Sequence, residues 1–281
     1  MIREIGYELL KMGHQKKNYI PLAGYILFVI LCYIACVTAF DAIIKSIVAY
    51  GLEREEAAKY LDGIFFARMV QVPTLIVLMP IVMATLGGDC VAGEMQEGSL
   101  KLYLTRPRSR WRVIFCKFVA VYLAGLIYCM LFAVGGLVIG YCLFGLAPAQ
   151  VVVLPARFFG APVEIMSNWE VIIRYFAVAI YFSFSLMILG GMALLFSVIF
   201  NRMSAATIAV ITLYFVSYII AEMPFAVALR PIMMSEVLSN AYIIFITPLP
   251  IYKLIINLAT QGLYACVMLL AAVIHFNNKD I

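Results

Sequence analysis

Six stretches of the chain are long enough and apolar enough to cross a lipid bilayer. A spanning helix needs about 20 mostly apolar residues to cross roughly 30 Å of hydrocarbon, and it satisfies its own backbone hydrogen bonds there. Apolar runs such as Phe118–Met130 do not alternate polar and apolar residues as the strands of a membrane barrel do. The sequence therefore predicts an all-α integral membrane protein with spans at Ile20–Phe40, Val70–Gly88, Val113–Phe144, Val171–Phe200, Ala205–Met223 and Leu254–Phe276.

The composition agrees with a membrane protein and excludes several soluble classes. Hydrophobic residues make up 65% of the chain and charged residues 12%, whereas soluble domains average about 45–50% and about 25%. This excludes a soluble enzyme, a secreted disulfide scaffold, a disordered chain and a nucleic-acid-binding domain. We therefore expect a lipid bilayer, and no nucleic acid, among its partners.

The distribution of charge predicts that both termini are cytoplasmic. With the N-terminus inside, most basic residues fall in inside segments, while the acids Glu53, Glu55 and Glu56 fall outside. The apolar run at Ile20–Phe40 is too long for the hydrophobic region of a signal peptide, so we interpret it as a retained span. The predicted organisation is an N-terminal cytoplasmic segment, 1–19, followed by a six-helix transmembrane domain, 20–281.

Residues 1–19 have the pattern of an amphipathic helix. Ile2, Ile5, Leu9 and Met12 recur at helical spacing, which predicts a helix lying at the inner membrane surface. The alternative is a helical cytoplasmic tail with no specific role. The other faces carry the charged residues Arg3, Glu4, Glu8 and Lys11.

The connection Pro224–Lys253 is too apolar for a solvated loop and too rich in proline for a complete span. A re-entrant helical element before the sixth span fits this pattern best, because irregular backbone at membrane depth must be covered by protein or line a cavity. An interfacial helix that caps the bundle is the alternative.

A few residues in and near the spans predict local features. Pro73 and Pro80 should kink the second span, and Gly136 with Gly140 permits close helix contact. Charged residues near the outer ends of spans are expected to snorkel toward water: Arg68, Arg174, Glu222 and Lys253.

The motifs of several chemistries are missing from the sequence. There is no phosphate-binding loop, because Gly93 is followed by Glu94 where a lysine is required. There is no H-E-x-x-H pair, and the seven cysteines lie in or beside spans, where no disulfide framework is expected. We therefore predict a non-catalytic chain without a cofactor or metal.

The segment between the second and third spans, 87–117, carries most of the informative charge. Its acids come first and its bases later. Pro107 can begin a short helix that presents Arg108 and Arg112 on one face, which would form a docking surface for a cytoplasmic partner. A solvated loop that obeys the positive-inside rule is the alternative.

The same segment resembles the signature of type-two ATP-binding-cassette (ABC) permeases, the membrane subunits of exporters. Six features of that family occur here in order over about thirty residues: Asp89, Glu94, Gly98-Ser99-Leu100, Pro107, Ser109-Arg110 and Lys117. In outline the resemblance extends to the whole chain, from the amphipathic N-terminal helix to the short C-terminal tail. The tail carries fewer basic residues than is common in the family.

The resemblance implies a transmembrane permease of the cell membrane that couples to a separate ATPase. ATP and Mg would then bind only to that ATPase, in two copies, and this chain would pair with a second permease copy, identical or paralogous. The implied ATPase-coupling interface comprises Asp89, Glu94, Glu97, Gly98, Ser99, Pro107, Arg108, Ser109, Arg110, Arg112 and Lys117.

Two other classes of function compete with this interpretation. An ion-gradient-driven secondary transporter or channel would need titratable groups near the middle of the membrane, and the spans offer almost none. A membrane-embedded enzyme would need a paired acid and base or a metal set. The apolar spans suit an amphipathic, lipid-like or peptide cargo, but they equally suit a pathway formed only between two copies.

Overall fold

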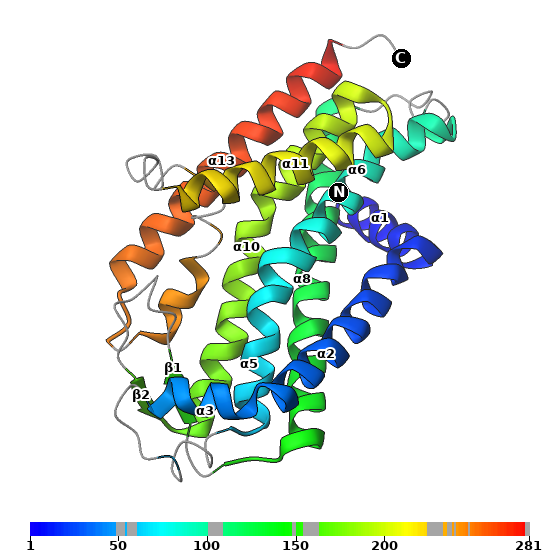
Figure 1. The fold of residues 1–281 in the computed structure, drawn as a ribbon. Coiled ribbons are helices and arrows are strands. Elements are labelled where there is room, and N and C mark those ends of the chain that lie inside the picture. The colour runs from blue at the N-terminus through cyan, green and yellow to red at the C-terminus, as the bar shows by residue number, and fades with distance from the viewer. Residues whose placement is uncertain are drawn as a thin grey trace.

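Six long apolar helices dominate the described part of the chain (Figure 1). The computed structural model describes residues 1–48, 54, 61–100, 109–147, 150–153, 163–223, 233–234, 238, 240–246 and 248–278. Within these residues, the helices suited to cross a membrane are Lys16–Thr38, Gly63–Gln96, Arg110–Phe144, Asn168–Phe200, Met203–Ala221 and Ile251–Asn277. The prediction of a helical membrane protein with six spans is confirmed.

The chain enters the bundle through a surface helix, α1, and the turn η1, which we call the elbow. Helix α1 is joined by the 3₁₀ turn η1 to the first span, α2, and α3 follows. The second span is composite, made of α5, the π-helical turn η2 and α6. The bounds of all described elements are α1 Ile2–His14, η1 Lys16–Tyr19, α2 Ile20–Thr38, α3 Phe40–Val48, α5 Gly63–Pro73, η2 Thr74–Leu78, α6 Met79–Gln96, α8 Arg110–Phe144, β1 Gln150–Val153, β2 Val163–Met166, α10 Asn168–Phe200, α11 Met203–Glu222, η5 Asn240–Phe245 and α13 Ile251–Asn277.

A small β-hairpin departs from the purely helical prediction. Strands β1 and β2 pair antiparallel, with Gln150 opposite Met166 and Val153 opposite Val163. The hairpin lies between α8 and α10, at the end of the bundle away from α1 (Figure 1). We call this the hairpin end and the opposite one the α1 end.

The second span is longer at both ends than the sequence suggested. It begins at Gly63 because the Asp62 carboxylate caps α5, accepting from Ile64 N at 3.1 Å and Phe65 N at 2.9 Å. It continues past Asp89 and Glu94 to Gln96. The sequence predicts an end at Gly88, just before these acids, but both carboxylates form ion pairs with lysines of the protein, so the helix continues.

The two prolines of the second span flank its irregular turn. Pro73 ends α5, Pro80 lies in the first turn of α6, and the backbone between them is π-helical. Pro80 has no N–H to donate to the Ile76 carbonyl four residues earlier. The Tyr214 hydroxyl of α11 donates to that carbonyl at 2.6 Å, so a neighbouring helix satisfies the backbone group that proline leaves open.

Gly140 and Gly136 have separate reasons to be glycine. A side chain at Gly140 would overlap the backbone oxygen of Gly63, so α8 and α5 meet there at backbone distance, as the spacing predicted. At Gly136, a methyl group would lie 3.1 Å from the Tyr25 hydroxyl and 3.0 Å from the Tyr175 hydroxyl. These two tyrosines donate to consecutive carbonyls of α8, at Phe132 and Ala133.

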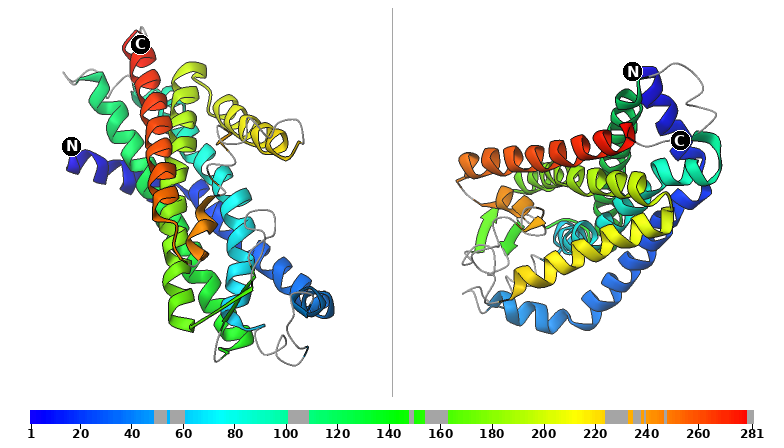
Figure 2. Two further views of the ribbon diagram at one scale, coloured as in Figure 1. Left: turned by 90° about the vertical axis from the view of Figure 1, so that its left-hand side faces the viewer. Right: turned by 90° about the horizontal axis from the view of Figure 1, so that it is seen from above.

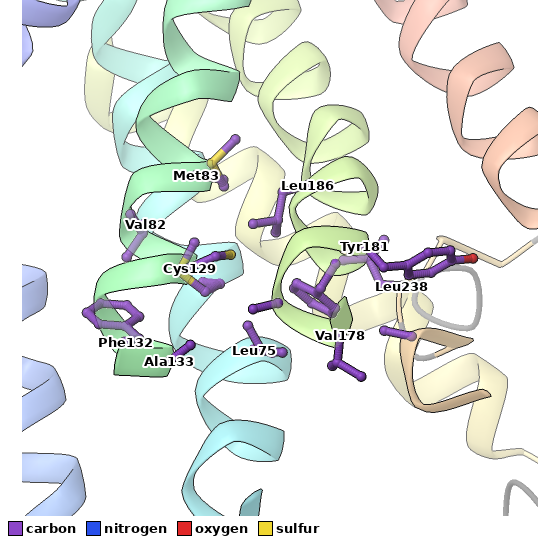
Figure 3. Close-up of a cluster of buried hydrophobic side chains, with 14 of the residues drawn as sticks. Leu75, Val82, Met83, Cys129, Phe132, Ala133, Val178, Tyr181, Leu186 and Leu238 are labelled. Carbon is purple, nitrogen blue, oxygen red and sulfur yellow. The ribbon is translucent and has the colours of Figure 1, made fainter. Parts of the chain in front are cut away.

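Helix α10 forms the centre of the bundle. It packs against α6, α8, α11 and α13, and the view from above shows α11 and α13 on either side of it (Figure 2). Figure 3 shows part of the core, where α10 meets the second and third spans; the labelled side chains are Leu75, Val82, Met83, Cys129, Phe132, Ala133, Val178, Tyr181, Leu186 and Leu238. By contrast, α2, α11 and α13 expose rows of large apolar side chains, which suits lipid or a second copy of the chain.

Two arginines at the hairpin end contact the turn η5. Arg174 of α10 is buried and donates from Nη1 to the carbonyls of Ile244 and Ile246, each at 3.1 Å. Arg68 of α5 lies over the Phe245 ring, 4.9 Å from its centroid. Arg174 therefore binds protein instead of extending toward water as expected, because η5 offers carbonyls within reach. Arg68 is only partly buried, so its snorkelling stays a prediction.

The segment before the sixth span is described only in part. The turn η5 is buried, with Ala241, Ile244 and Phe245 almost inaccessible to solvent. Residues 224–232 lie outside the described residues, so a re-entrant path for the whole segment stays a prediction.

Candidate functional site

Four charged side chains from three helices meet at the α1 end. Lys117 Nζ of α8 lies 2.6 Å from Glu94 Oε1 of α6 and 3.0 Å from Glu8 Oε1 of α1. Lys11 Nζ of α1 lies 2.7 Å from the same Glu94 oxygen. We call Glu8, Lys11, Glu94 and Lys117 the charge network; it holds two acids and two bases and has no net formal charge.

Two side chains of the charge network are buried, so their charges must be paired for the fold to be stable. The Lys117 side chain is only 1% exposed and that of Glu94 11%. A charge this deep must be paired, because taking it out of water unpaired costs several kcal/mol. The pairing explains why α6 can continue as a helix through Glu94, and it joins α1 to the bundle.

A second ion pair extends the attachment of the elbow to α6. Lys17 Nζ of η1 lies 2.7 Å from Asp89 Oδ2. A side chain at Gly93 would overlap the Asp89 carboxylate one turn earlier, so the glycine leaves room for it. The amphipathic pattern of residues 1–19 predicts charged faces turned to water, but Glu8, Lys11 and Lys17 face the bundle.

Helix α6 is also held to α10 next to the charge network. The Ser197 hydroxyl of α10 donates to the Gly88 carbonyl at 2.7 Å and accepts from the Ala92 N–H at 2.7 Å. Ser197 is fully buried, and it satisfies both groups of α6 without any charge. A serine in an apolar span gives little signal of its own, so the sequence did not indicate this contact.

The Gly98-Ser99-Leu100 step forms the exit from α6. Gly98 has φ of +73°, a left-handed conformation that favours glycine, and its N–H donates to the Met95 carbonyl at 3.2 Å. The Ser99 hydroxyl donates to the Glu94 carbonyl at 3.3 Å. Leu100 is fully buried against α8 and α13 residues such as Ile114 and Phe276. The three residues turn the chain, close the helix end and anchor it against α8 and α13.

The basic residues that begin α8 have different surroundings. Arg110 donates from Nη1 to the carbonyls of Phe276 at 3.3 Å and Asn277 at 3.2 Å, the last carbonyls of α13. A cation there also complements the negative end of the α13 dipole. Arg112 and its neighbour Trp111 are exposed, as are Glu97 and the α8 N-cap Ser109.

The structure thus gives the described residues of the predicted interface different surroundings. Glu94 and Lys117 contact each other inside the bundle, and Asp89 pairs with the elbow instead. Exposed positions are Glu97, Ser109 and Arg112, whereas Arg110 binds the end of α13. Pro107 and Arg108, with the short helix expected there, lie outside the described residues.

The missed members of the site are Glu8, Lys11 and Lys17. Glu8 and Lys11 are three residues apart, so they share one face of α1, which is the only sequence signal that could have indicated a common partner. Within the described residues, no group of three or more His, Cys, Asp or Glu side chains could hold a metal ion.

Nearly the whole chain matches a known protein family. Residues 6–281 match the family model described as "ABC-2 family transporter protein". No curated protein matches the chain. The family match spans nearly the whole chain and includes the charge network, the Gly98 turn and the start of α8.

Proposed function

The chain belongs to the ABC-2 family of transporters as a multi-pass membrane permease whose ABC ATPase is a separate subunit, and on that premise we propose how the ATPase acts on it. The segment from Asp89 to Lys117 receives the ATPase at the membrane surface. The charge network then passes the displacement of this segment to α1, α6 and α8.

The position of the charge network carries this proposal. Glu94 and Lys117 stand on the two helices that enter and leave the segment, and they bind each other at 2.6 Å. A displacement of this segment must either break this buried contact or move α1 together with α6 and α8. In the sequence between Glu94 and Lys117, the exposed Trp111 and Arg112 offer an aromatic and basic surface of the kind enriched at protein interfaces.

The mechanism follows from linkage. ATP binding to the ATPase can switch the bundle only if the ATP-bound ATPase favours one of two bundle states.

We propose export as the direction, with two permease copies forming the pathway and two ATPases bound at the α1 end. In this arrangement both termini are cytoplasmic, α1 lies at the inner leaflet of the cell membrane, and the segment before α13 is re-entrant. The exposed apolar rows on α2, α11 and α13 support packing against lipid or the second copy.

The test uses the full-length chain in nanodiscs with the ATPase that co-purifies with it. Arg112→Glu should weaken ATPase binding about tenfold, the effect of losing about 1.4 kcal/mol at an interface. Lys45→Glu, an equal charge reversal on the exposed surface of α3, is the control and should leave binding unchanged.

Glu94→Gln separates transmission from docking. We expect ATPase binding to persist while stimulation of ATP hydrolysis by the permease is lost, with the melting temperature recorded to detect misfolding. Unchanged binding in Arg112→Glu together with unchanged stimulation in Glu94→Gln would refute the proposal. Transport that persists after ATP depletion would instead favour an ion-gradient-driven transporter.

A further inference from the structure

An apolar cavity lies at the elbow, between α1, the start of α2, α6 and α8. Its volume is about 180 Å³, and Figure 1 shows α1 and α2 diverging from this elbow. The side chains that give it its apolar character are Leu9, Met12, Leu22, Leu86, Ile127 and Leu131.

The polar groups of the cavity wall are already satisfied inside the protein. The Asn18 amide donates to the Met12 carbonyl at 2.7 Å, and the Tyr128 hydroxyl donates to the Asn18 carbonyl. The Tyr19 hydroxyl donates to the Gly13 carbonyl at 2.8 Å. The wall therefore presents mostly hydrocarbon, which suits an apolar ligand.

The cavity is accessible from the part of the surface that faces lipid. Ile127 and Leu131 of the third span line it and are about half exposed, at 52% and 49%. A shallow groove along α1 shares Leu9, Gly13 and Tyr19 with the cavity, so the two lie next to each other. A hydrocarbon chain can therefore enter from the bilayer without opening the bundle.

The charge beside the cavity selects one class of occupant. Lys11 and Lys17 are held by Glu94 and Asp89. Lys16 begins η1, the 3₁₀ turn that supplies Asn18 and Tyr19 of the cavity wall, and it shares a face of that turn with Tyr19, three residues later. Lys16 is exposed and has no ion-pair partner among the described residues. A lysine in this position at a membrane surface attracts anionic headgroups.

We propose that the elbow cavity binds one acyl chain of an anionic phospholipid from the adjoining leaflet, with the headgroup phosphate beside Lys16. The bound lipid fills the space between α1 and α8, where Met12 and Leu86 separate it from the pocket lined by Glu8 and Lys11. The proposal does not depend on the ATPase, so it can stand or fall separately from the coupling function.

The first experiment fills the cavity mouth. The full-length chain in detergent is titrated with palmitoyl-oleoyl phosphatidylglycerol or phosphatidylcholine, and bound lipid is counted by native mass spectrometry. In Gly13→Phe, the new side chain meets no atom within 4 Å at its Cβ, so it can occupy the groove. We expect about a tenfold loss of phosphatidylglycerol affinity, because excluding two methylene groups costs about that factor. Gly262→Phe, at an equally open position on α13, is the matched control.

The second experiment tests the headgroup with a variant that cannot disturb the core. Lys16→Glu should abolish the preference for phosphatidylglycerol over phosphatidylcholine, whereas Lys45→Glu should preserve it. Equal retention of phosphatidylglycerol by Gly13→Phe and the unmodified chain would overturn the proposal. Equal retention of the two lipids by the unmodified chain would also overturn it.

Discussion

The two ends of the bundle use charged side chains in different ways. At the α1 end, the lysines and glutamates of the charge network bind one another across α1, α6 and α8. At the hairpin end, buried charged side chains bind backbone: Asp62 accepts from three N–H groups, including that of Ala147 at 2.9 Å, and Arg174 donates to two carbonyls of η5 in addition to its ion pair with Glu170. Arg110 is the exception at the α1 end, because it is only partly buried and donates to the last carbonyls of α13.

This difference indicates different mechanical roles. A backbone carbonyl keeps its position and its dipole whatever side chains surround it, so Asp62 and Arg174 act as fixed clamps. A contact between two charged side chains depends on both helices keeping their faces together, so it responds to displacement of either one. We infer that the α1 end is suited to transmit motion and that the hairpin end is suited to resist it.

The largest expected effect comes from removing the buried cation of the charge network. Lys117→Met leaves Glu94 and Glu8 buried with one lysine fewer, and we expect a loss of about 3–5 kcal/mol in unfolding free energy. Unfolding in mixed detergent micelles measures it, with Arg112→Met, at an exposed position on the same helix, as the control. Adding Glu94→Met to Lys117→Met should recover part of the loss, since an apolar pair then replaces a buried acid that has lost one of its two lysines. A double variant no more stable than the single one would contradict the pairing.

A smaller loss is expected from the clamp at the hairpin end. Arg174→Met removes the charged donor to the Ile244 and Ile246 carbonyls, which should cost about 2–3 kcal/mol and speed hydrogen exchange at 240–246. Arg202→Met, at an exposed position on the α10–α11 turn, should do neither.

A charge exchange sharpens the contrast between the ends. Arg174→Glu with Glu170→Lys restores an ion pair but no donor to the carbonyls, so we expect no recovery of exchange protection at η5. Recovery would show that Arg174 acts mainly through Glu170, 2.6 Å away, and would make the two ends alike.

At the π-helical turn η2, between the two ends, removing one hydrogen bond should lower the free energy of unfolding by about 1 kcal/mol. Tyr214→Phe deletes the donor to the Ile76 carbonyl, which Pro80 cannot replace. Hydrogen exchange and unfolding measurements test this, with the exposed Tyr252→Phe as the control. Equal stability of the two variants would mean that another group satisfies that carbonyl.

The smallest effect belongs to an exposed ion pair. Arg54 Nη2 and Asp41 Oδ1 lie 2.9 Å apart, but both side chains are more than 70% exposed. Solvent screens such a pair, so Asp41→Asn should change unfolding free energy by less than about 0.5 kcal/mol, and added salt should erase the difference. A loss of unfolding free energy close to that of Arg174→Met would contradict this and show that the exposed pair stabilises the hairpin end as much as Arg174 does.

Local patterns explain which predictions succeeded. Apolar runs of sufficient length predicted the six spans, and the Gly136–Gly140 spacing predicted a close helix contact, because both depend mainly on one segment of chain. The Gly98-Ser99-Leu100 step was recognised as part of a motif, and its left-handed glycine gives that motif a physical reason. Boundaries were less accurate, because Asp89 and Glu94 looked like the end of a span.

The sequence by itself determined that this chain lies in a membrane, how many helices cross it and which family it resembles. Only the tertiary structure decided where the scarce charges go. Glu8, Glu94 and Lys117 come from three different helices, and Arg174 reaches carbonyls some seventy residues away. Hydrophobic length is a property of one helix, whereas the partner of a buried charge depends on which faces of different helices meet.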